Sequence, residues 1–285
     1  MSWELKGAAW SWLAIGLICS ISSCVPVVTT ASYDRLSQDL LARGYLRTEV
    51  APADAPYGFE RLTETFRELT FSYEFHFDGD RIVNERIGKP LKRWSGTIRY
   101  KLIGDGFTVA DTEETNALFE RLAKITDLQF TLGEEAPDLL ISIAGPQGRS
   151  EVSEHLAEQG LPVYRQRYDL WRQTPDWMCG ATLSSSGTDP GRLVFAHVFI
   201  RSEVTGLLRT ACLQEEIIQS LGLTNDSDNA RPSLFNDDLE FAVMTEHDEL
   251  LLRALYDPRL QTGMTESQAI PIIRQIFTES LPPAD

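Results

Sequence analysis

The chain has 285 residues, of which 42% are hydrophobic and 24% are charged, a composition typical of a globular protein with one good core or two small ones. Its formal net charge of −16 and the lack of a visible basic cluster argue against nucleic acid as a partner. An acidic protein is also repelled by anionic head groups, so a lipid anchor would be its only evident attachment to a membrane.

The N-terminus resembles a bacterial export signal. A short charged start is followed by an uncharged run over residues 7–31 that is apolar at its centre. Residues 21–24, Ile-Ser-Ser-Cys, resemble a lipobox, in which the cysteine receives a lipid. We therefore expect residues 1–23 to be a signal peptide and Cys24 to anchor the protein to a bacterial membrane. A cleaved signal without lipid and an uncleaved anchor are the alternatives, and all three place the body outside the cytoplasm, for example in the periplasm.

The segment 24–90 contains two helical patterns. Apolar residues recur at helical spacing in residues 33–43 and again in residues 59–75. The Pro-rich residues 51–56 between them predict an extended or turn segment. We expect a helical N-terminal segment that precedes a main domain at residues 91–285.

The main domain is predicted to have an α/β (α+β) fold with a mixed sheet. Alternating or short apolar runs predict strands, and longer runs with helical periodicity predict helices. In chain order these are a strand at 94–102, a helix at 112–125, strands at 128–132, 139–143 and 193–200, and a helix at 207–221. The polar residues 146–190 are expected to form an irregular insertion, and further helices are expected at the C-terminus.

Two cysteines, Cys179 and Cys212, lie in the body of the chain. In an oxidising compartment an even pair is most simply a disulfide. It would close a loop of about 33 residues and contribute about 3 kcal/mol to stability in the loop-entropy account. Two unrelated buried thiols are the alternative.

Residues 211–226 resemble the zinc-binding helix of metzincin peptidases, whose pattern is H-E-x-x-H-x-x-G-x-x-H, often followed by Asp. In this alignment Glu216 takes the general-base position and Gly222 is the glycine that ends the helix. The three metal-ligand positions and the residue after them are Glu215, Gln219, Asn225 and Asp226. Imidazole binds zinc well and amides bind it poorly, so the stretch points to a zincin-like fold and argues against zinc.

Other stretches extend the resemblance. The order of the expected elements is that of the N-terminal half of a zincin, residues 233–236 resemble a Met-turn without its methionine, and residues 244–256 resemble the last helix of matrixin-like peptidases. A more specific similarity is carried by a set of residues that includes Cys212, Glu215, Glu216, Gln219, Gly222, Asn225, Asp226, Ser233, Thr245, Asp248 and Tyr256. Through them, residues 90–280 resemble the bacterial family known as domain of unknown function 2927, found in predicted lipoproteins. The resemblance implies a distant zincin relative with no assigned activity.

The altered motif leads to a functional expectation. We expect an envelope lipoprotein whose degenerate, non-catalytic metallopeptidase-like domain acts in binding or structure, without a cofactor, and receives a peptide or protein partner in the old cleft. Gln219 and Asn225 would then hydrogen-bond loop backbone where a metal once held the helix and the next turn together.

An enzyme remains the alternative function. Glu216 is the candidate catalytic residue, because in a zincin this carboxylate activates the metal-bound water. An unconventional metal site could be built from Glu215, Asp226 and His247, a donor set that suits calcium or manganese better than zinc. Otherwise Glu215 and Glu216 are acids of a helix face, one solvated and one hydrogen-bonded in the cleft.

Overall fold

The computed structural model describes residues 29–79, 81–83, 85–133, 135–174, 177–236 and 238–281. The predicted signal peptide and Cys24 lie outside these residues. None of the helices within them combines the length and the hydrophobicity that crossing a bilayer requires.

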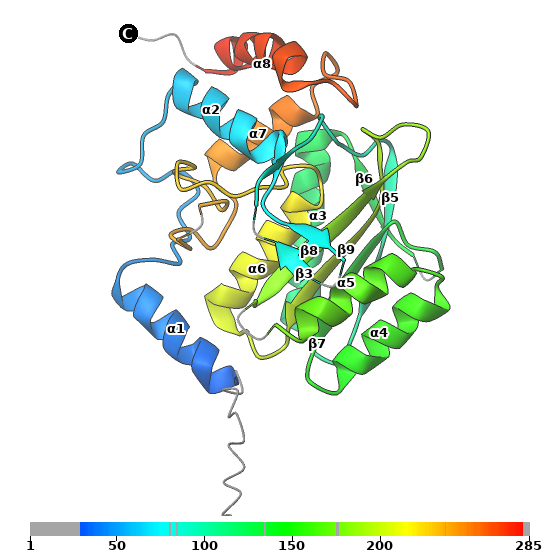
Figure 1. The fold of residues 1–285 in the computed structure, drawn as a ribbon. Coiled ribbons are helices and arrows are strands. Elements are labelled where there is room, and N and C mark those ends of the chain that lie inside the picture. Colours follow the sequence, from blue (N-terminus) through cyan, green and yellow to red (C-terminus); the bar gives the residue numbers. More distant parts are fainter. Residues whose placement is uncertain are drawn as a thin grey trace, which may run out of the picture.

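A five-stranded mixed sheet lies at the centre of the molecule (Figure 1). Its strands, in the order in which they lie side by side, are β6 (Gln129–Leu132), β5 (Thr97–Ile103), β7 (Leu139–Ala144), β9 (Leu193–Arg201) and β8 (Cys179–Ser185). The first four are parallel, and β8 pairs with β9 in the antiparallel direction and forms one edge. The central strand β7 is buried along its whole length, which explains its nearly continuous apolar sequence.

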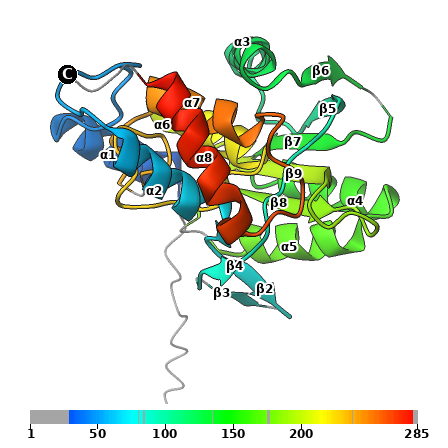
Figure 2. The same ribbon diagram turned by 90° about the horizontal axis from the view of Figure 1, so that it is seen from above.

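Helices cover both faces of this sheet (Figure 2). One face carries α4 (Gly148–Glu158) and α5 (Pro162–Arg172), and the other carries α3 (Val109–Thr126) and α6 (Gly206–Gln219). Alternate residues of β7 point to opposite faces of the sheet. Leu140 packs with apolar residues of α4 and α5, whereas Leu139 and Ile141 belong to the larger core on the side of α6.

The N-terminal and C-terminal helices extend the larger core. They are α1 (Thr30–Ala42), α2 (Phe59–Thr70), α7 (Glu246–Leu255) and α8 (Glu266–Ser280). Phe66 of α2 and Phe277 of α8 are fully buried and meet edge to face, with ring centroids 6.1 Å apart. Apolar residues from both sides of the predicted domain boundary after residue 90 therefore form one core, and the boundary itself stays a prediction.

The fold class predicted from the sequence is confirmed: the protein is a mixed α/β structure with the expected strands and with helices at the expected places. The expected relation to zincins stays a hypothesis. The predicted helix at 59–75 is too long, because α2 ends at Thr70. The residues that follow, Ser-Tyr-Glu-Phe-His-Phe, alternate polar and aromatic side chains and form strands instead.

These strands build two short antiparallel pairs in front of the sheet. β1 (Ser72–Tyr73) pairs with β4 (Ile87–Gly88), and between them β2 (His76–Asp78) pairs with β3 (Arg81–Val83). The segment 73–77 lies next to β8, so it forms one wall of the site described below.

The prediction that residues 146–190 are irregular is wrong, because they form α4, α5 and β8. In α5, Tyr164, Tyr168 and Trp171 recur at helical spacing and pack on the sheet. The many charged residues on the other face of α5 lower its average hydrophobicity and conceal this pattern. The sequence does not indicate β8 because two of its three buried residues are Gly180 and Ala181, residue types that are depleted in strands.

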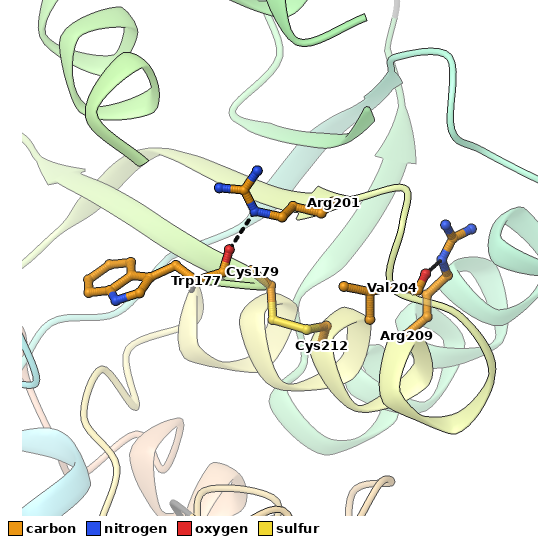
Figure 3. The surroundings of a disulfide bond; sticks show 6 residues. All are labelled: Trp177, Cys179, Arg201, Val204, Arg209 and Cys212. Atoms are coloured by element: carbon orange, nitrogen blue, oxygen red, sulfur yellow. Dashed lines mark hydrogen bonds between the residues drawn. A yellow bond between two sulfur atoms is a disulfide. The ribbon is translucent and has the colours of Figure 1, made fainter. Parts of the chain in front are cut away.

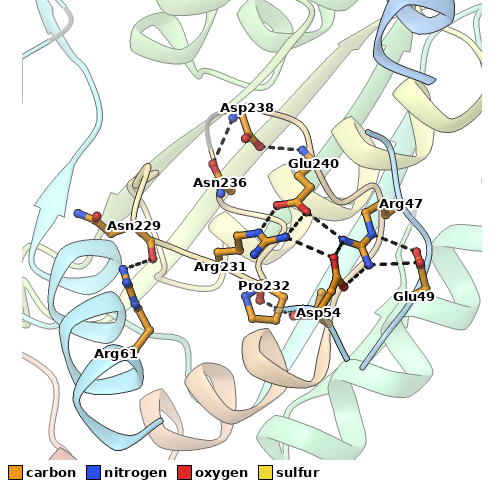
Figure 4. Close-up of polar contacts among 11 residues, drawn as sticks. Arg47, Glu49, Asp54, Arg61, Asn229, Arg231, Pro232, Asn236, Asp238 and Glu240 are labelled. Carbon is orange, nitrogen blue, oxygen red and sulfur yellow. Dashed lines mark hydrogen bonds and ion pairs between the residues drawn. The ribbon is translucent and has the colours of Figure 1, made fainter. Parts of the chain in front are cut away.

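The long loop between α6 and α7 is fastened to the N-terminal segment by charges (Figure 4). Arg47 pairs with Asp54 at 2.7 Å and with Glu240 at 3.0 Å, and Glu240 also accepts a hydrogen bond of 2.6 Å from Arg231. Backbone hydrogen bonds accompany these pairs, since Arg47 N donates to Glu240 O and Leu46 N donates to Leu239 O. The loop is therefore held at its outer side by residues far away in the sequence.

The inner side of the same loop is held by one buried carboxylate, that of Asp248 at the start of α7. It accepts hydrogen bonds from Ser233 Oγ at 2.5 Å, Leu234 N at 3.0 Å and both the backbone N and the Oγ1 of Thr245. Asp248 and Thr245 are completely buried. The carboxylate thus caps α7 and fixes the preceding loop at the same time.

We expect Asp248→Asn to destabilise the protein by about 2–3 kcal/mol, because hydrogen bonds to a charged group are lost and an amide group faces buried donors. Chemical denaturation measures the loss. The matched control is Asp228→Asn, which changes an exposed carboxylate in the same loop and should leave the free energy of unfolding nearly unchanged. Equal stability of the two variants would contradict the assigned role of Asp248.

Candidate functional site

Two adjoining cavities follow the edge strand β8. The first, of about 250 Å³, lies beside Cys179 and Gly180 at the start of the strand. The second, of about 370 Å³, lies beside residues 181–185 at its end. Both are lined by Glu74, Phe75 and Gln219, so they adjoin and form one groove, which we call the edge cleft.

The first cavity is acidic. The carboxylates that line it are Glu74 from the segment after β1, Glu215 and Glu216 from α6, and Asp226 from the loop after α6. We call it the acidic cavity. The structure thus brings four of the predicted motif positions, Glu215, Glu216, Gln219 and Asp226, to one cavity.

Glu216 is the buried carboxyl group of the acidic cavity. Its side chain is buried, and its Oε2 atom has no hydrogen-bond partner among the described residues. Burial raises the pKa of Glu216 well above the ordinary value of 4.5, and the negative charges of Asp226 and Glu74 raise the pKa further. A carboxyl group in such surroundings retains its proton at higher pH than an exposed glutamate does.

The two amides of the motif make hydrogen bonds within the protein. Gln219 Nε2 donates to Asp226 Oδ1 at 2.8 Å. Asn225 Nδ2 donates to two backbone carbonyls, Glu68 O at 3.1 Å and Asp226 O at 2.7 Å. Asn225 therefore bonds loop backbone as expected, whereas Gln219 bonds a carboxylate. The Gln219 contact connects the end of α6 to the loop that follows it, and the Asn225 contact to Glu68 O connects that loop to α2.

His247 does not line the acidic cavity. It lies in the first turn of α7, fully buried, with its ring edge to face against Tyr57 at 4.9 Å between centroids. The proposed ligands Glu215 and Asp226 are on the cavity without it. Within the described part of the chain, no three His, Cys, Asp or Glu side chains are placed so that they could hold a metal ion.

Gly222 is required by its surroundings. Its φ of +127° is unfavourable for residues with a side chain, and a Cβ atom there would lie 2.3 Å from Lys92 O. Its carbonyl accepts a hydrogen bond of 3.4 Å from the buried ammonium of Lys89. Burial lowers the pKa of Lys89 to about 7, and the charge of Lys92 contributes to the shift. The glycine allows the chain to turn closely against the segment that carries both lysines.

The predicted disulfide between Cys179 and Cys212 is confirmed, with Cα atoms 5.9 Å apart (Figure 3). It joins the first residue of β8 to α6 one helical turn before Glu216. Near it, Arg201 Nε donates a hydrogen bond of 2.7 Å to Trp177 O. The rim of the edge cleft is thus covalently fixed to the helix that forms its floor.

The second cavity has the opposite polarity, and we call it the basic cavity. Lys92 and Arg167 line it together with His76 and the buried Thr182, and Glu74, which it shares with the acidic cavity, is the one carboxylate among its lining residues. None of these residues, nor Glu74, was singled out from the sequence, because they come from four separate segments and follow no common spacing. In the sequence, only the alternation of polar and aromatic residues over 72–77 indicates the segment 73–77 that forms this wall of the cleft.

The family comparison agrees with the resemblance found in the sequence. The family described as protein of unknown function (DUF2927) matches residues 60–275, which is most of the chain. The chain therefore belongs to the DUF2927 family. Among curated proteins, no sequence matches it at a significant level.

We expect Glu216→Gln to change how stability depends on pH. As the pH rises above 4.5, the unfolded chain loses its proton first, so the wild type loses stability at up to about 1.4 kcal/mol per pH unit until the pKa of the folded state is reached. The variant lacks this loss. Its stability relative to wild type should therefore increase from pH 4 to pH 8, measured by chemical denaturation across this range.

The control for this experiment is Glu215→Gln, because Glu215 is the neighbouring carboxylate of the same cavity and is only half-buried. The stability of Glu215→Gln relative to wild type should increase less between pH 4 and pH 8 than that of Glu216→Gln. Parallel pH curves for wild type and Glu216→Gln would show that Glu216 has an ordinary pKa in the folded protein.

Proposed function

We propose that this protein is a non-catalytic, extracytoplasmic binding protein that holds an extended peptide in the edge cleft, beside β8. The observation that carries the proposal is the free outer edge of β8, which borders both cavities along its whole length. A strand edge that opens into a groove offers unpaired backbone donors and acceptors to a second strand.

The position of β8 in the sheet supports this mode of binding. Within the described residues, β9 is the only strand that pairs with β8, and the other side of β8 faces the cleft. From Cys179 to Ser185 the strand spans about 20 Å, at about 3.3 Å per residue. This length suits about six residues of an extended ligand.

The state of the motif residues supports a binding role over metal catalysis. The positions that correspond to the metzincin histidines are Glu215, Gln219 and Asn225, and the two amides already make hydrogen bonds within the protein. Amides are weak ligands for zinc.

A zincin ancestry would explain why the cleft is present. The mixed sheet with an antiparallel edge strand, the helix α6 beneath it and the glycine turn at Gly222 agree with that relationship. In this proposal the groove and the edge strand are retained, while the metal site is replaced by hydrogen bonds between α6 and its loop.

Export to the cell envelope is part of the proposal. The disulfide between Cys179 and Cys212 supports an oxidising compartment such as the periplasm, because reducing agents in the cytoplasm keep most thiols reduced. We propose that Cys24 carries the lipid that attaches the protein to the bacterial membrane. The inner and the outer membrane are both compatible with it.

The binding proposal is tested with a library of randomised hexapeptides and the purified full-length protein, using affinity selection and mass spectrometry. For selected peptides, each backbone amide is then methylated in turn. Because only alternate amides of a strand face its neighbour, methylation should reduce affinity at every second position. Ser184→Tyr, which fills the basic cavity, should weaken binding at least tenfold, whereas Thr131→Tyr on the opposite edge of the sheet should not.

The same samples test the enzyme alternative. We expect no stoichiometric metal by elemental analysis and no peptide cleavage that chelators inhibit. One metal ion per chain that is lost in Glu215→Ala, together with cleavage abolished by Glu216→Gln, would replace the binding proposal with a hydrolase whose metal site is built from oxygen ligands.

The anchoring proposal predicts that Cys24→Ala accumulates as an unprocessed precursor or is released from membranes in a bacterial host. Cell fractionation and labelling with a radioactive fatty acid measure this. Cys19→Ala, which changes the other cysteine of the leader, should behave like wild type. Undiminished lipid labelling of Cys24→Ala would contradict the proposal that Cys24 carries the lipid.

A further inference from the structure

We propose that the basic cavity is a subsite for a carboxylate group, and that in a bound peptide this group is the C-terminal carboxylate. The proposal deepens the peptide-binding function proposed above and rests on it. It assigns a direction to the ligand and predicts selectivity for peptides with a free C-terminus.

The cations of the basic cavity have no carboxylate partner among the described residues. Lys92 Nζ lies 5.4 Å from the ring centroid of Tyr73, and the Arg167 guanidinium lies 4.8 Å from that of Phe77. Other arginines of this acidic protein bind carboxylates, as Arg47 does, or backbone carbonyls, as Arg201 does. Among the described residues, Lys92 and Arg167 form no ion pair with Glu74, which also lines the cavity. The two half-buried cations are therefore available to the negative charge of a ligand.

Hydrogen-bond donors on the same cavity also lack partners. Thr182 is only 3% exposed, and its Oγ1 atom has no hydrogen-bond partner in the described part of the chain. The same is true of Ser185 Oγ and His76 Nδ1. Buried polar groups are normally satisfied, so several unsatisfied ones on one cavity indicate a ligand rich in acceptor atoms. A carboxylate has two acceptor oxygens and fits both the charges and the hydroxyl groups.

The distribution of charge along β8 selects the C-terminus as the source of this carboxylate. The acidic cavity adjoins Cys179 and Gly180, and the basic cavity adjoins residues 181–185. A peptide with free ends is positive at its amino terminus and negative at its carboxyl terminus. The complementary arrangement places the amino terminus near Cys179 and the carboxylate near Ser185, so the peptide runs parallel to β8.

The test compares three libraries of randomised hexapeptides built from uncharged residues: C-terminal acids, C-terminal amides, and amides with one internal glutamate. Affinity selection is done with wild type, with Lys92→Gln/Arg167→Gln, and with the charge-preserving variant Lys92→Arg/Arg167→Lys. The matched control is Arg165→Gln, because Arg165 lies on the same helix but is paired with Asp169.

We expect wild type to select acids over amides at least tenfold, the double glutamine variant to lose this preference, and the charge-preserving variant and Arg165→Gln to keep most of it. Equal selection of acids and amides by wild type overturns the proposal. Selection of the glutamate library over the acids assigns the subsite to an acidic side chain and overturns the assignment to the C-terminus.

Titration with acetate, followed by the amide resonances of Thr182 and Ser184, separates this proposal from the function on which it rests. Saturable shifts that disappear in Lys92→Gln/Arg167→Gln, without selection of any library, would retain the carboxylate subsite and reject the peptide. Peptide selection without C-terminal preference, together with no acetate response, would retain the peptide function and reject the subsite.

Discussion

The burial of α6 is the constraint on which the rest of the site depends. Nine of its fourteen residues are buried, so this helix has little freedom to expose polar side chains. Arg209 is satisfied by Asp111 at 2.9 Å and by backbone carbonyls of nearby loops. Glu216, by contrast, forms no ion pair with a cation among the described residues, and Gln219 donates to the carboxylate of Asp226. Glu216 and Gln219 both line the acidic cavity, and Gln219 also lines the basic cavity.

Three connections hold that helix in register with its surroundings. The disulfide joins Cys212 to the edge strand, Gln219 bonds Asp226 in the following loop, and the buried Lys89 bonds the carbonyl of Gly222. Each involves a different side of α6 or of its C-terminal turn. Together they fix the floor, the rim and one end of the edge cleft.

The sequence predicts an element correctly where the burial of that one element determines the spacing of its apolar residues. The alternation in β5 and β9, the apolar run of β7 and the helical period of α3 and α6 all reflect burial against one core, and these elements were found. The failures have physical causes. α5 buries only three aromatic side chains and exposes a charged face, so its average hydrophobicity is lower than that of a typical core helix. The buried part of β8 consists of small residues, so its average hydrophobicity is lower than that of a typical core strand.

The residues of the candidate site also fall into a group that the sequence predicts and a group that it does not. Glu216, Gln219 and Asp226 were found because they lie within one helix and its turn, where spacing along the chain translates directly into position. Glu74, Lys92 and Arg167 reach the cleft from separate segments, and only the tertiary structure brings them together. His247 illustrates the converse error: it has the right chemistry for a ligand, but the fold buries it against Tyr57.

The net charge of the chain does not reveal the unpaired positive charges that line the basic cavity. A total of −16 argues against nucleic acid as a partner but does not indicate where unpaired charges lie. Much of the positive charge is neutralised locally, as in the cluster around Arg47 and Glu240, and such pairs act only on the fold. Lys92 and Arg167 differ because aromatic rings, not carboxylates, lie beside them. A cation held against an aromatic ring keeps its charge available to a ligand, and the acidic cavity at the other end of β8 then gives the groove its direction.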